Sequence, residues 1–403
     1  MVHELRNQPF RGLYLAYQLF TTTLLRYPLW VLLALPRSWR PRASWSLGRC
    51  LKVRLIRHLS GVNDKVVLSP SHTNHLAIPN DNNAGEKALW IDPAPELIHG
   101  ELLNWASITG VTPIRIPGYW IERRGVDMAV GAPLQPGEKI LYRLHGGGYV
   151  GLSAHPSDPS TAISRDLMHF CAPFKRTFAI EYRLSKAAPY VPANPFPAAL
   201  FDALAGYSYL VNSAGFRPED IVVEGDSAGG NLALALVRYL VESQESPCVP
   251  APPGGMILLS PWTDISVSHE TTDSSMLSSI GSDTLGTGLN GRAAYPKLAF
   301  LGALGLSAAE SNAYISPASL HLRCSFKNFP RTFVCAGGAE MFVDQIRTLV
   351  ARMAGDMGEG AGMGQVVYYE ASDGVHVYPA FDFHEPERSE TYRAIAQWVA
   401  AEQ

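Results

Sequence analysis

The chain has few charged residues, few cysteines and no long uninterrupted apolar run. Charged side chains make up 17% of its 403 residues and the net charge is −3, so the charge balance does not favour binding to nucleic acid. The five cysteines are odd in number and follow no metal-ligand spacing, which predicts free thiols in an intracellular protein that is not secreted. No Asn-x-Ser/Thr sequon occurs, in agreement with that compartment.

Short apolar runs alternate with helical patterns along most of the chain. This alternation predicts an α/β fold, with a mostly parallel sheet covered by helices on both faces. The expected strands are 138–144, 177–182, 220–225, 256–259, 331–336 and 365–370, and the expected helices are 157–170, 197–213, 229–244, 341–354 and 389–401.

The rest of the chain does not follow this alternation of strands and helices. Residues 59–110 are predicted to be an irregular lead-in, and residues 112–123 a first hairpin. The stretch 266–314 is rich in Ser, Thr and Gly and is expected to be an insertion that contributes to a lid or cap. The expected units are an N-terminal segment with cap lead-in, a first core part, this insertion and a second core part, at 1–110, 111–265, 266–314 and 315–403.

A glycine-flanked serine follows the apolar run 221–223. Residues 225–230 read Gly-Asp-Ser-Ala-Gly-Gly, and a helix is expected from Asn231. A strand, a sharp turn and a helix are the context of a nucleophile elbow, in which glycines allow a strained, closely approached backbone. We therefore predict acyl chemistry with Ser227 as nucleophile, while a phosphate-binding turn is the alternative for this motif alone.

A second glycine run, His145-Gly146-Gly147-Gly148, lies upstream after another strand-like run. Acyl transfer passes through an oxyanion that needs backbone N–H donors, and glycine allows the backbone to approach closely. We expect Gly146, Gly147 and Ala228, the residue after the nucleophile, to supply these donors. A flexible loop would also explain the glycines, but both motifs in this order favour the catalytic interpretation.

A serine nucleophile needs a base and an orienting acid, in the chain order serine, acid, histidine. His376 lies in the loop after the last expected strand, where catalytic groups collect, whereas His384 is expected at a solvated helix start. After the preceding strand, Glu340 lies in a turn from which it can reach a neighbouring loop. Asp344 is expected one turn into a helix, as a charge favoured by the helix dipole, so Glu340 is preferred as the acid.

Several further segments fit a known pattern around these residues. They are 181–184 (Glu-Tyr-Arg-Leu), 194–200 with Asp202, 260–264 (Ser-Pro-Trp-Thr-Asp), 314–317, 338–344 and 373–376. Together with the two glycine motifs they resemble the hormone-sensitive-lipase-like family of α/β-hydrolases, over roughly residues 95–400. The resemblance implies an α/β-hydrolase fold, although the family's acid is usually Asp and this chain has Glu340. Arg40, Trp45 and the residues around Glu340 look most like the fungal branch, which includes steryl-acetyl hydrolases and small-ester hydrolases of secondary metabolism.

These residues predict a serine hydrolase that cleaves carboxylic esters through an acyl-enzyme. Ser227 attacks the carbonyl while His376, oriented by Glu340, takes its proton, and neither a metal nor an organic cofactor is expected. The aromatic-rich segment 182–209 and the resemblance to the fungal branch favour a small hydrophobic ester, with a short acyl group such as acetyl on a bulky apolar alcohol. An amidase or deacetylase with the same triad, or a non-catalytic ligand receptor on this scaffold, remains an alternative, and the oligomeric state stays open.

The most apolar stretch, residues 13–36, lies in a basic segment. Residues 1–60 carry ten Lys or Arg and a single acid, which leaves the rest of the chain at −12. Arg26 and Pro28 divide the stretch into parts shorter than the ~20 residues of a spanning helix, and no cleavable signal pattern is evident. Two interpretations stay open, a peripheral membrane contact through residues 13–57 and a cap over the active site, with a true membrane span third. We expect a cytoplasmic or membrane-associated protein, for example at the endoplasmic reticulum.

Overall fold

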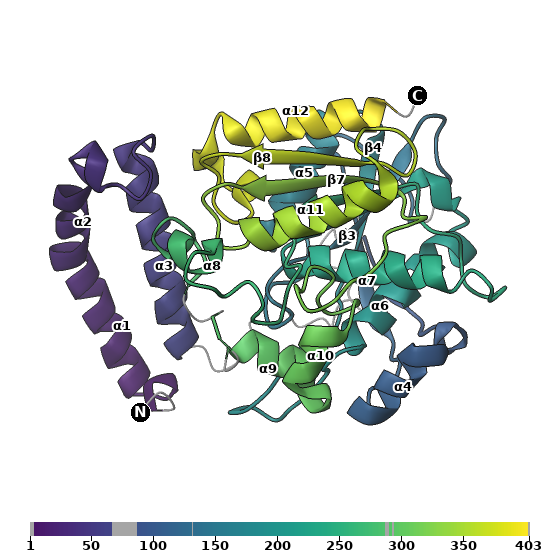
Figure 1. The fold of residues 1–403 in the computed structure, drawn as a ribbon, viewed down its shortest axis with the longest axis horizontal. Coiled ribbons are helices and arrows are strands. Elements are labelled where there is room, and N and C mark those ends of the chain that lie inside the picture. Colours follow the sequence, from purple (N-terminus) through teal and green to yellow (C-terminus); the bar gives the residue numbers. More distant parts are fainter. Residues whose placement is uncertain (1–3, 67–86, 131, 287–289, 292–293, 402–403) are drawn as a thin grey trace.

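A computed structural model describes residues 4–66, 87–130, 132–286, 290, 291 and 294–401 (Figure 1). Its strands are β1 (Lys87–Ile91), β2 (Ile116–Glu122), β3 (Lys139–Leu144), β4 (Phe174–Ile180), β5 (Ile221–Asp226), β6 (Gly255–Leu259), β7 (Arg331–Gly337) and β8 (Val366–Ala371). Its helices are α1 (Phe10–Thr21), α2 (Tyr27–Ala34), α3 (Leu47–Val66), α4 (Gly100–Thr109), α5 (Ala162–Phe170), α6 (Ala198–Ser208), α7 (Ala228–Glu242), α8 (Ser275–Ser278), α9 (Tyr295–Leu301), α10 (Gly305–Ser311), α11 (Val343–Met357) and α12 (Glu387–Ala400). All six strands expected from the apolar runs are present, with small shifts at their ends.

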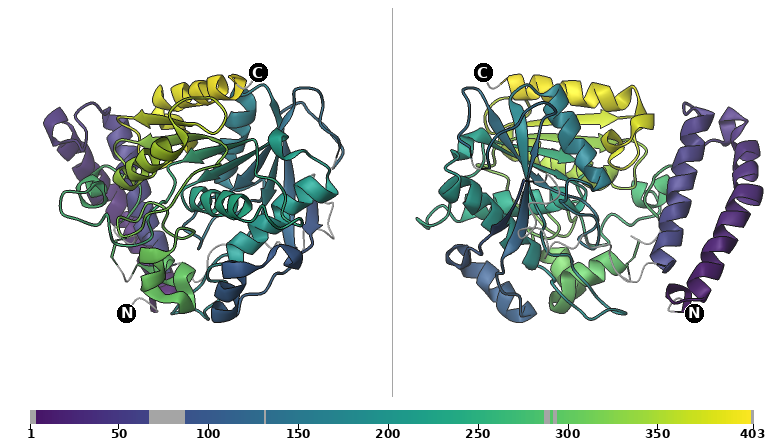
Figure 2. Two further views of the ribbon diagram at one scale, coloured as in Figure 1. Left: turned by 45° about the vertical axis from the view of Figure 1, so that its right-hand side comes forward. Right: turned by 180° about the vertical axis from the view of Figure 1, so that it is seen from behind.

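The described strands form one sheet in the order β1-β2-β4-β3-β5-β6-β7-β8. Pairing is parallel from β4 to β8, and β2 runs antiparallel to both of its neighbours. Successive side chains of a strand point to opposite faces, so Ile140 and Tyr142 belong to one hydrophobic core and Leu141 to the other. Helices α4, α6, α7 and α11 cover the first face, and α5 and α12 cover the second (Figure 2). Helix α3 stands beside the ends of the strands, where its Cys50 and Val53 join the second core. The predicted α/β-hydrolase architecture, with helices on both faces of a mostly parallel sheet, is therefore confirmed.

The region before β3 differs from the expectation. Residues 112–123 form no hairpin, because β2 pairs with β1 on one side and with β4 on the other. Residues 59–110 are not irregular throughout, since they contain the end of α3, all of β1 and α4, while 67–86 lie outside the described residues. Strand β1 is a short strand at the edge of the sheet, where it pairs with β2, and most of its residues are only half-buried.

Helix α3 connects the N-terminal segment to the rest of the molecule. The Trp45 indole N–H donates to the carbonyl of Asp373 at 3.1 Å, and Arg49 pairs with Glu387 at 2.7 Å. Helices α1 and α2, joined by a π-helical turn, lie on the far side of α3 (Figures 1 and 2). Among the helices described, none is long and apolar enough to cross a membrane.

The predicted insertion at 266–314 contains the short helices α8, α9 and α10 in its described part. Helix α8 packs against α11, and α9 packs against α10. A lid role for this stretch stays a prediction. All five cysteines are free, as their spacing predicted.

Candidate active site

Ser227 occupies the sharp turn between β5 and α7, with φ 53° and ψ −117°. This conformation is unfavourable for a residue with a side chain, so neighbouring contacts must hold it. Its N–H donates to the carbonyl of Leu259 at 3.0 Å, and its own carbonyl accepts from the N–H of Trp262 at 2.8 Å. Helix α7 begins at Ala228, earlier than the expected Asn231, because Ser227 itself precedes the first helical turn.

The elbow glycines are explained by the close approach of neighbouring backbone. A Cβ on Gly225 would collide with the backbone of Gly229, and a Cβ on Gly229 would collide with the carbonyl of Leu144 at the end of β3. A side chain at Gly225 would therefore distort the elbow itself, and one at Gly229 would push the elbow away from the end of β3. The sequence pattern around Ser227 is thus a packing requirement of this turn.

His376 lies beside Ser227, in the loop after β8. Its Nε2 is 2.9 Å from the Ser227 Oγ, and only 6% of the residue is exposed. Burial lowers the pKa of His376, although the carboxylates of Asp283 and Asp226 act in the opposite direction. The ring is therefore mainly neutral near pH 7, the state in which Nε2 can accept the serine proton.

Glu340 lies on the other side of the His376 ring and is completely buried. Its Oε2 is 3.6 Å from His376 Nδ1, and the same oxygen accepts a hydrogen bond from the Ser260 hydroxyl at 2.6 Å. Burial raises the pKa of Glu340 to about 8, because desolvation disfavours the carboxylate. A positive imidazolium forming next to it would act in the opposite direction and favour the ionised form. A buried carboxyl in this position can stabilise that imidazolium.

Asp344, the alternative acid, points elsewhere. Its carboxylate accepts from the N–H of Ser275 at 2.7 Å and from the Arg347 guanidinium at 3.2 Å, and about a third of the side chain is exposed. The structure thus places Ser227, His376 and Glu340 in a row and leaves Asp344 outside it.

The loop after β3 differs in one respect from the expected oxyanion hole. The N–H of Gly146 donates to the carboxylate of Asp226 at 3.2 Å, and this carboxylate also binds the buried Arg143 at 3.0 Å. Gly146 is therefore not a free donor, since its N–H binds the same Asp226 oxygen as Arg143. Within the described part of the chain, the N–H groups of Gly147 and Ala228 have no hydrogen-bond partner.

His145 and His384 are both buried. The His145 ring stacks on Tyr182 with centroids 4.2 Å apart, and burial lowers its pKa to about 3. His384 was expected at a solvated helix start, but it is fully buried near Trp45 and Phe383, and burial lowers its pKa to about 4. That expectation was wrong because the segment before α3 folds over this loop.

The described residues contain no cluster of His, Cys, Asp and Glu side chains that could hold a metal ion.

Comparison with known proteins identifies the family. The sequence profile of the α/β hydrolase fold family matches residues 141–380, which is more than half of the chain. The chain belongs to this α/β-hydrolase family.

Among curated relatives, an esterase of Acinetobacter venetianus is 29% identical to this chain over 163 residues, covering 40% of the chain and 45% of the relative. Steryl acetyl hydrolase 1 of Saccharomyces cerevisiae is 27% identical over 133 residues, covering 33% of the chain and 28% of the relative. The chain thus spans less than half the length of these relatives. The crystal structure of an esterase from the bacterial hormone-sensitive lipase family shares the fold, with a TM-score of 0.58 and 20% identity, covering 89% of this chain and 99% of that one.

Two residues that support the site were not predicted to do so. Ser260 directly follows β6 with φ 47°, donates to Glu340 and accepts from the N–H of Val377 at 3.0 Å. The position of Ser260 directly after a buried strand could have indicated that it lies at the site. Asp283 lies in the expected insertion and is completely buried, and its carboxylate accepts from the N–H groups of His376 and Met341, each at 2.8 Å. No local pattern marks Asp283, because its partners lie 93 and 58 residues further along the chain.

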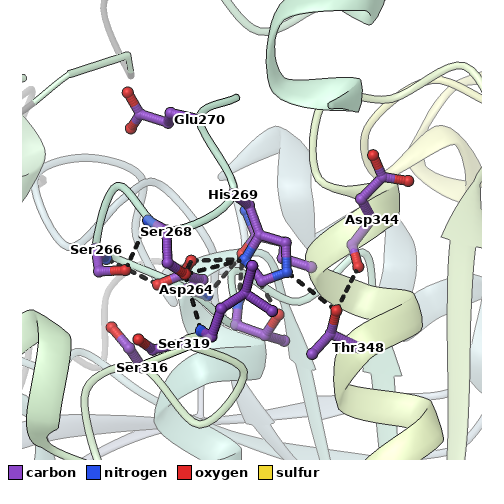
Figure 3. A network of polar contacts seen from close by, with 12 residues as sticks. Asp264, Ser266, Ser268, His269, Glu270, Ser316, Ser319, Asp344 and Thr348 are labelled. Carbon is purple, nitrogen blue, oxygen red and sulfur yellow. Dashed lines mark hydrogen bonds and ion pairs between the residues drawn. The ribbon is translucent and has the colours of Figure 1, made fainter. Parts of the chain in front are cut away.

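A separate polar network joins the start of the expected insertion to α11 (Figure 3). His269 Nδ1 is 2.7 Å from the Asp264 carboxylate, and its Nε2 is 3.0 Å from the hydroxyl of Thr348. The Thr348 hydroxyl donates its hydrogen to the carbonyl of Asp344. It therefore accepts the hydrogen bond from His269 Nε2 and does not donate to that nitrogen. Burial opposes ionisation of Asp264, but hydrogen bonds from His269, Ser266 and Ser268 keep its pKa low. The network has no exposed hydroxyl nucleophile, and it fixes the segment that leads to Asp283.

Proposed function

We propose that this hydrolase cleaves carboxylic esters with Ser227 as nucleophile, His376 as general base and Glu340 as the orienting acid. The observation that carries this proposal is the 2.9 Å separation of the Ser227 Oγ and the His376 Nε2 at a strained strand-to-helix turn. In the first half of the reaction, the Ser227 oxygen bonds to the ester carbonyl carbon while its proton moves to His376 Nε2. The Glu340 carboxylate stabilises the imidazolium so formed, and this proton then passes to the departing alcohol.

The second half repeats these steps with water in place of the serine. His376 takes a proton from the water, the hydroxide attacks the acyl-enzyme, and the proton returns to Ser227 as the acid is released. The developing oxyanion needs N–H donors, and we assign this role to Gly147 and Ala228, whose N–H groups have no other partner in the described residues. Gly146 instead holds the loop against the elbow through Asp226.

The proposed substrate is a small hydrophobic ester with a short acyl group, such as acetyl, on a bulky apolar alcohol. Directly after the glycine run, the ring of Tyr149 stacks on Phe300 of α9 at 3.9 Å, and Phe196 lies 5.6 Å from Phe300. These buried rings occupy space beside the oxyanion loop, which favours a small acyl group. The name of the yeast relative, steryl acetyl hydrolase 1, agrees with such an ester.

A panel of chromogenic esters graded by acyl length tests this function. We expect hydrolysis of the acetyl ester by the full chain, decreasing rates as the acyl chain lengthens, and no turnover by Ser227→Ala. Absence of turnover on every ester would contradict the proposed reaction. Rates that rise steadily from acetyl to long-chain esters would contradict only the proposed substrate.

A further inference from the structure

The outer face of α1 and α2 exposes an unusual concentration of large apolar side chains. Of the 25 exposed large apolar residues in the described chain, 14 lie between Phe10 and Trp39. Leu13, Leu19 and Phe20 of α1 are 64%, 69% and 63% exposed, and Leu32 of α2 is 62% exposed. Contiguous apolar surface of this kind marks a site of contact with a membrane or another molecule.

Contact with α3 leaves this face uncovered. Between Phe10 and Trp39, Ala34 alone is buried. The half-buried residues of this segment are Arg11, Gly12, Tyr14, Gln18, Thr21, Thr22, Arg26, Trp30 and Val31. The contact is partly polar, since the Thr22 hydroxyl lies 2.8 Å from His58 Nε2 and Arg54 donates to the carbonyl of Trp30. The leucine and phenylalanine side chains on the other side therefore have no partner within the described residues.

The charge of this segment indicates what covers it. From Phe10 to Trp39 the chain has no acidic residue and three basic ones, of which Arg26 binds Thr21 and Thr22 while Arg11 and Arg37 lie at the two ends of the segment. Apolar side chains bordered by arginine suit the boundary between anionic headgroups and acyl chains, where burial of the apolar groups and attraction of the arginines act together. We propose that the outer face of α1 and α2 docks on an anionic membrane surface, from which the proposed esterase takes its ester.

The position of α3 indicates how docking would orient the proposed catalytic residues relative to the membrane. The carboxyl ends of β7 and β8, which lead to Glu340 and His376, point toward the side of the molecule where α3 lies (Figure 1). Around α3, Trp45 bonds the His376 loop through the Asp373 carbonyl, and Arg57 donates to the carbonyl of Gly281, close to Asp283. Docking through α1 and α2 therefore places the catalytic edge of the sheet on the membrane side. The identity of the substrate in this proposal rests on the proposed function, whereas the membrane contact does not depend on that function.

Vesicle sedimentation with the purified full chain tests the docking. The probes are vesicles of phosphatidylcholine alone and of phosphatidylcholine with phosphatidylserine. We compare wild type with Leu13→Glu/Phe20→Glu on the outer face and with Leu103→Glu/Ile108→Glu on α4, a matched control at two other exposed apolar positions. We expect wild type and the control to bind, more strongly with phosphatidylserine, and the outer-face variant to bind at least about tenfold more weakly. A further variant, Arg11→Gln/Arg37→Gln, is expected to lose mainly the preference for phosphatidylserine.

The outcomes separate the two proposals. Turnover of a water-soluble acetyl ester is expected to be equal in all four proteins, which also shows that they are folded. A wild type that binds vesicles but hydrolyses no ester would overturn the proposed function and leave the docking intact. Equal vesicle binding by wild type and the outer-face variant would overturn the docking. So would a wild type that ignores vesicles and forms oligomers that the outer-face variant does not, since this face would then join copies of the chain.

Discussion

The buried carboxylate of Asp283 accepts a hydrogen bond from the backbone N–H of His376 at 2.8 Å. Its other oxygen accepts from the N–H of Met341, the residue after Glu340, also at 2.8 Å. A single side chain from the 266–314 stretch therefore holds the histidine loop and the acid turn at a fixed separation. Asp283 touches no reacting atom and is a positioning residue.

Asp283→Asn is expected to lower kcat by about 10²-fold with little change in KM, because small misplacements of catalytic groups have effects of this size. An asparagine amide cannot accept from both N–H groups, so one loop must shift. Since the Asp283 carboxylate raises the pKa of His376, the acidic limb of the pH–rate profile is also expected to move to lower pH. The exposed Asp273→Asn in the same stretch is the control and should match wild type. An unshifted pH profile with unchanged kcat would contradict the positioning role.

Ser227→Ala is expected to reduce kcat on a short ester by a factor on the order of 10⁶ while leaving the thermal unfolding midpoint nearly unchanged. The hydroxyl contributes the attacking oxygen and little packing. Ester hydrolysis and circular dichroism measure the two effects, with the exposed Ser372→Ala as control. Retention of more than a few per cent of wild-type turnover would show that another residue is the nucleophile.

Glu340→Gln is expected to be far more damaging than Asp344→Asn. The glutamine cannot stabilise the imidazolium of His376, a loss of roughly 10⁴ in kcat for an orienting acid. Asp344 interacts with Ser275 and Arg347 instead, so its substitution should cost little activity. Single-turnover rates of the two variants would reveal the order, and the opposite order would transfer the acid role to Asp344.

The pH dependence of kcat/KM follows from the same two groups. His376 must be neutral to accept a proton, and burial lowers its pKa. The acidic limb of the pH–rate profile should therefore lie below pH 6.5, about the ordinary pKa of histidine. Burial raises the pKa of Glu340 to about 8, and the carboxyl supports catalysis only when ionised, so activity should rise again through that region. The rise near pH 8 should disappear in Glu340→Gln. A wild-type profile that is level between pH 7 and 9 would contradict this assignment.

Most of the fold could be predicted because its signals are local. The apolar runs of β3, β5 and β7 are buried on both faces of the sheet, so they read as strands without knowledge of their neighbours. Strand β1 could not be recognised in this way, since its pairing with β2 decides its conformation. The exposure of α1 and α2 was likewise unpredictable, because the same apolar pattern suits a helix that covers a pocket.

The sequence by itself determined the strand-to-helix turn at Ser227, and it predicted the roles proposed for His376 and Glu340. Glycine spacing and apolar runs are properties of neighbouring residues, and chain order is read directly from the sequence. A turn that tolerates no Cβ at Gly225 or Gly229 requires glycine at both positions, and the sequence shows this directly. Only the tertiary structure decided that Gly146 binds Asp226, that Ser260 binds Glu340 and that Asp283 joins the loops of Glu340 and His376. These contacts connect residues far apart in the chain, and the geometry of a hydrogen bond across the sheet edge exists only after the strands have paired.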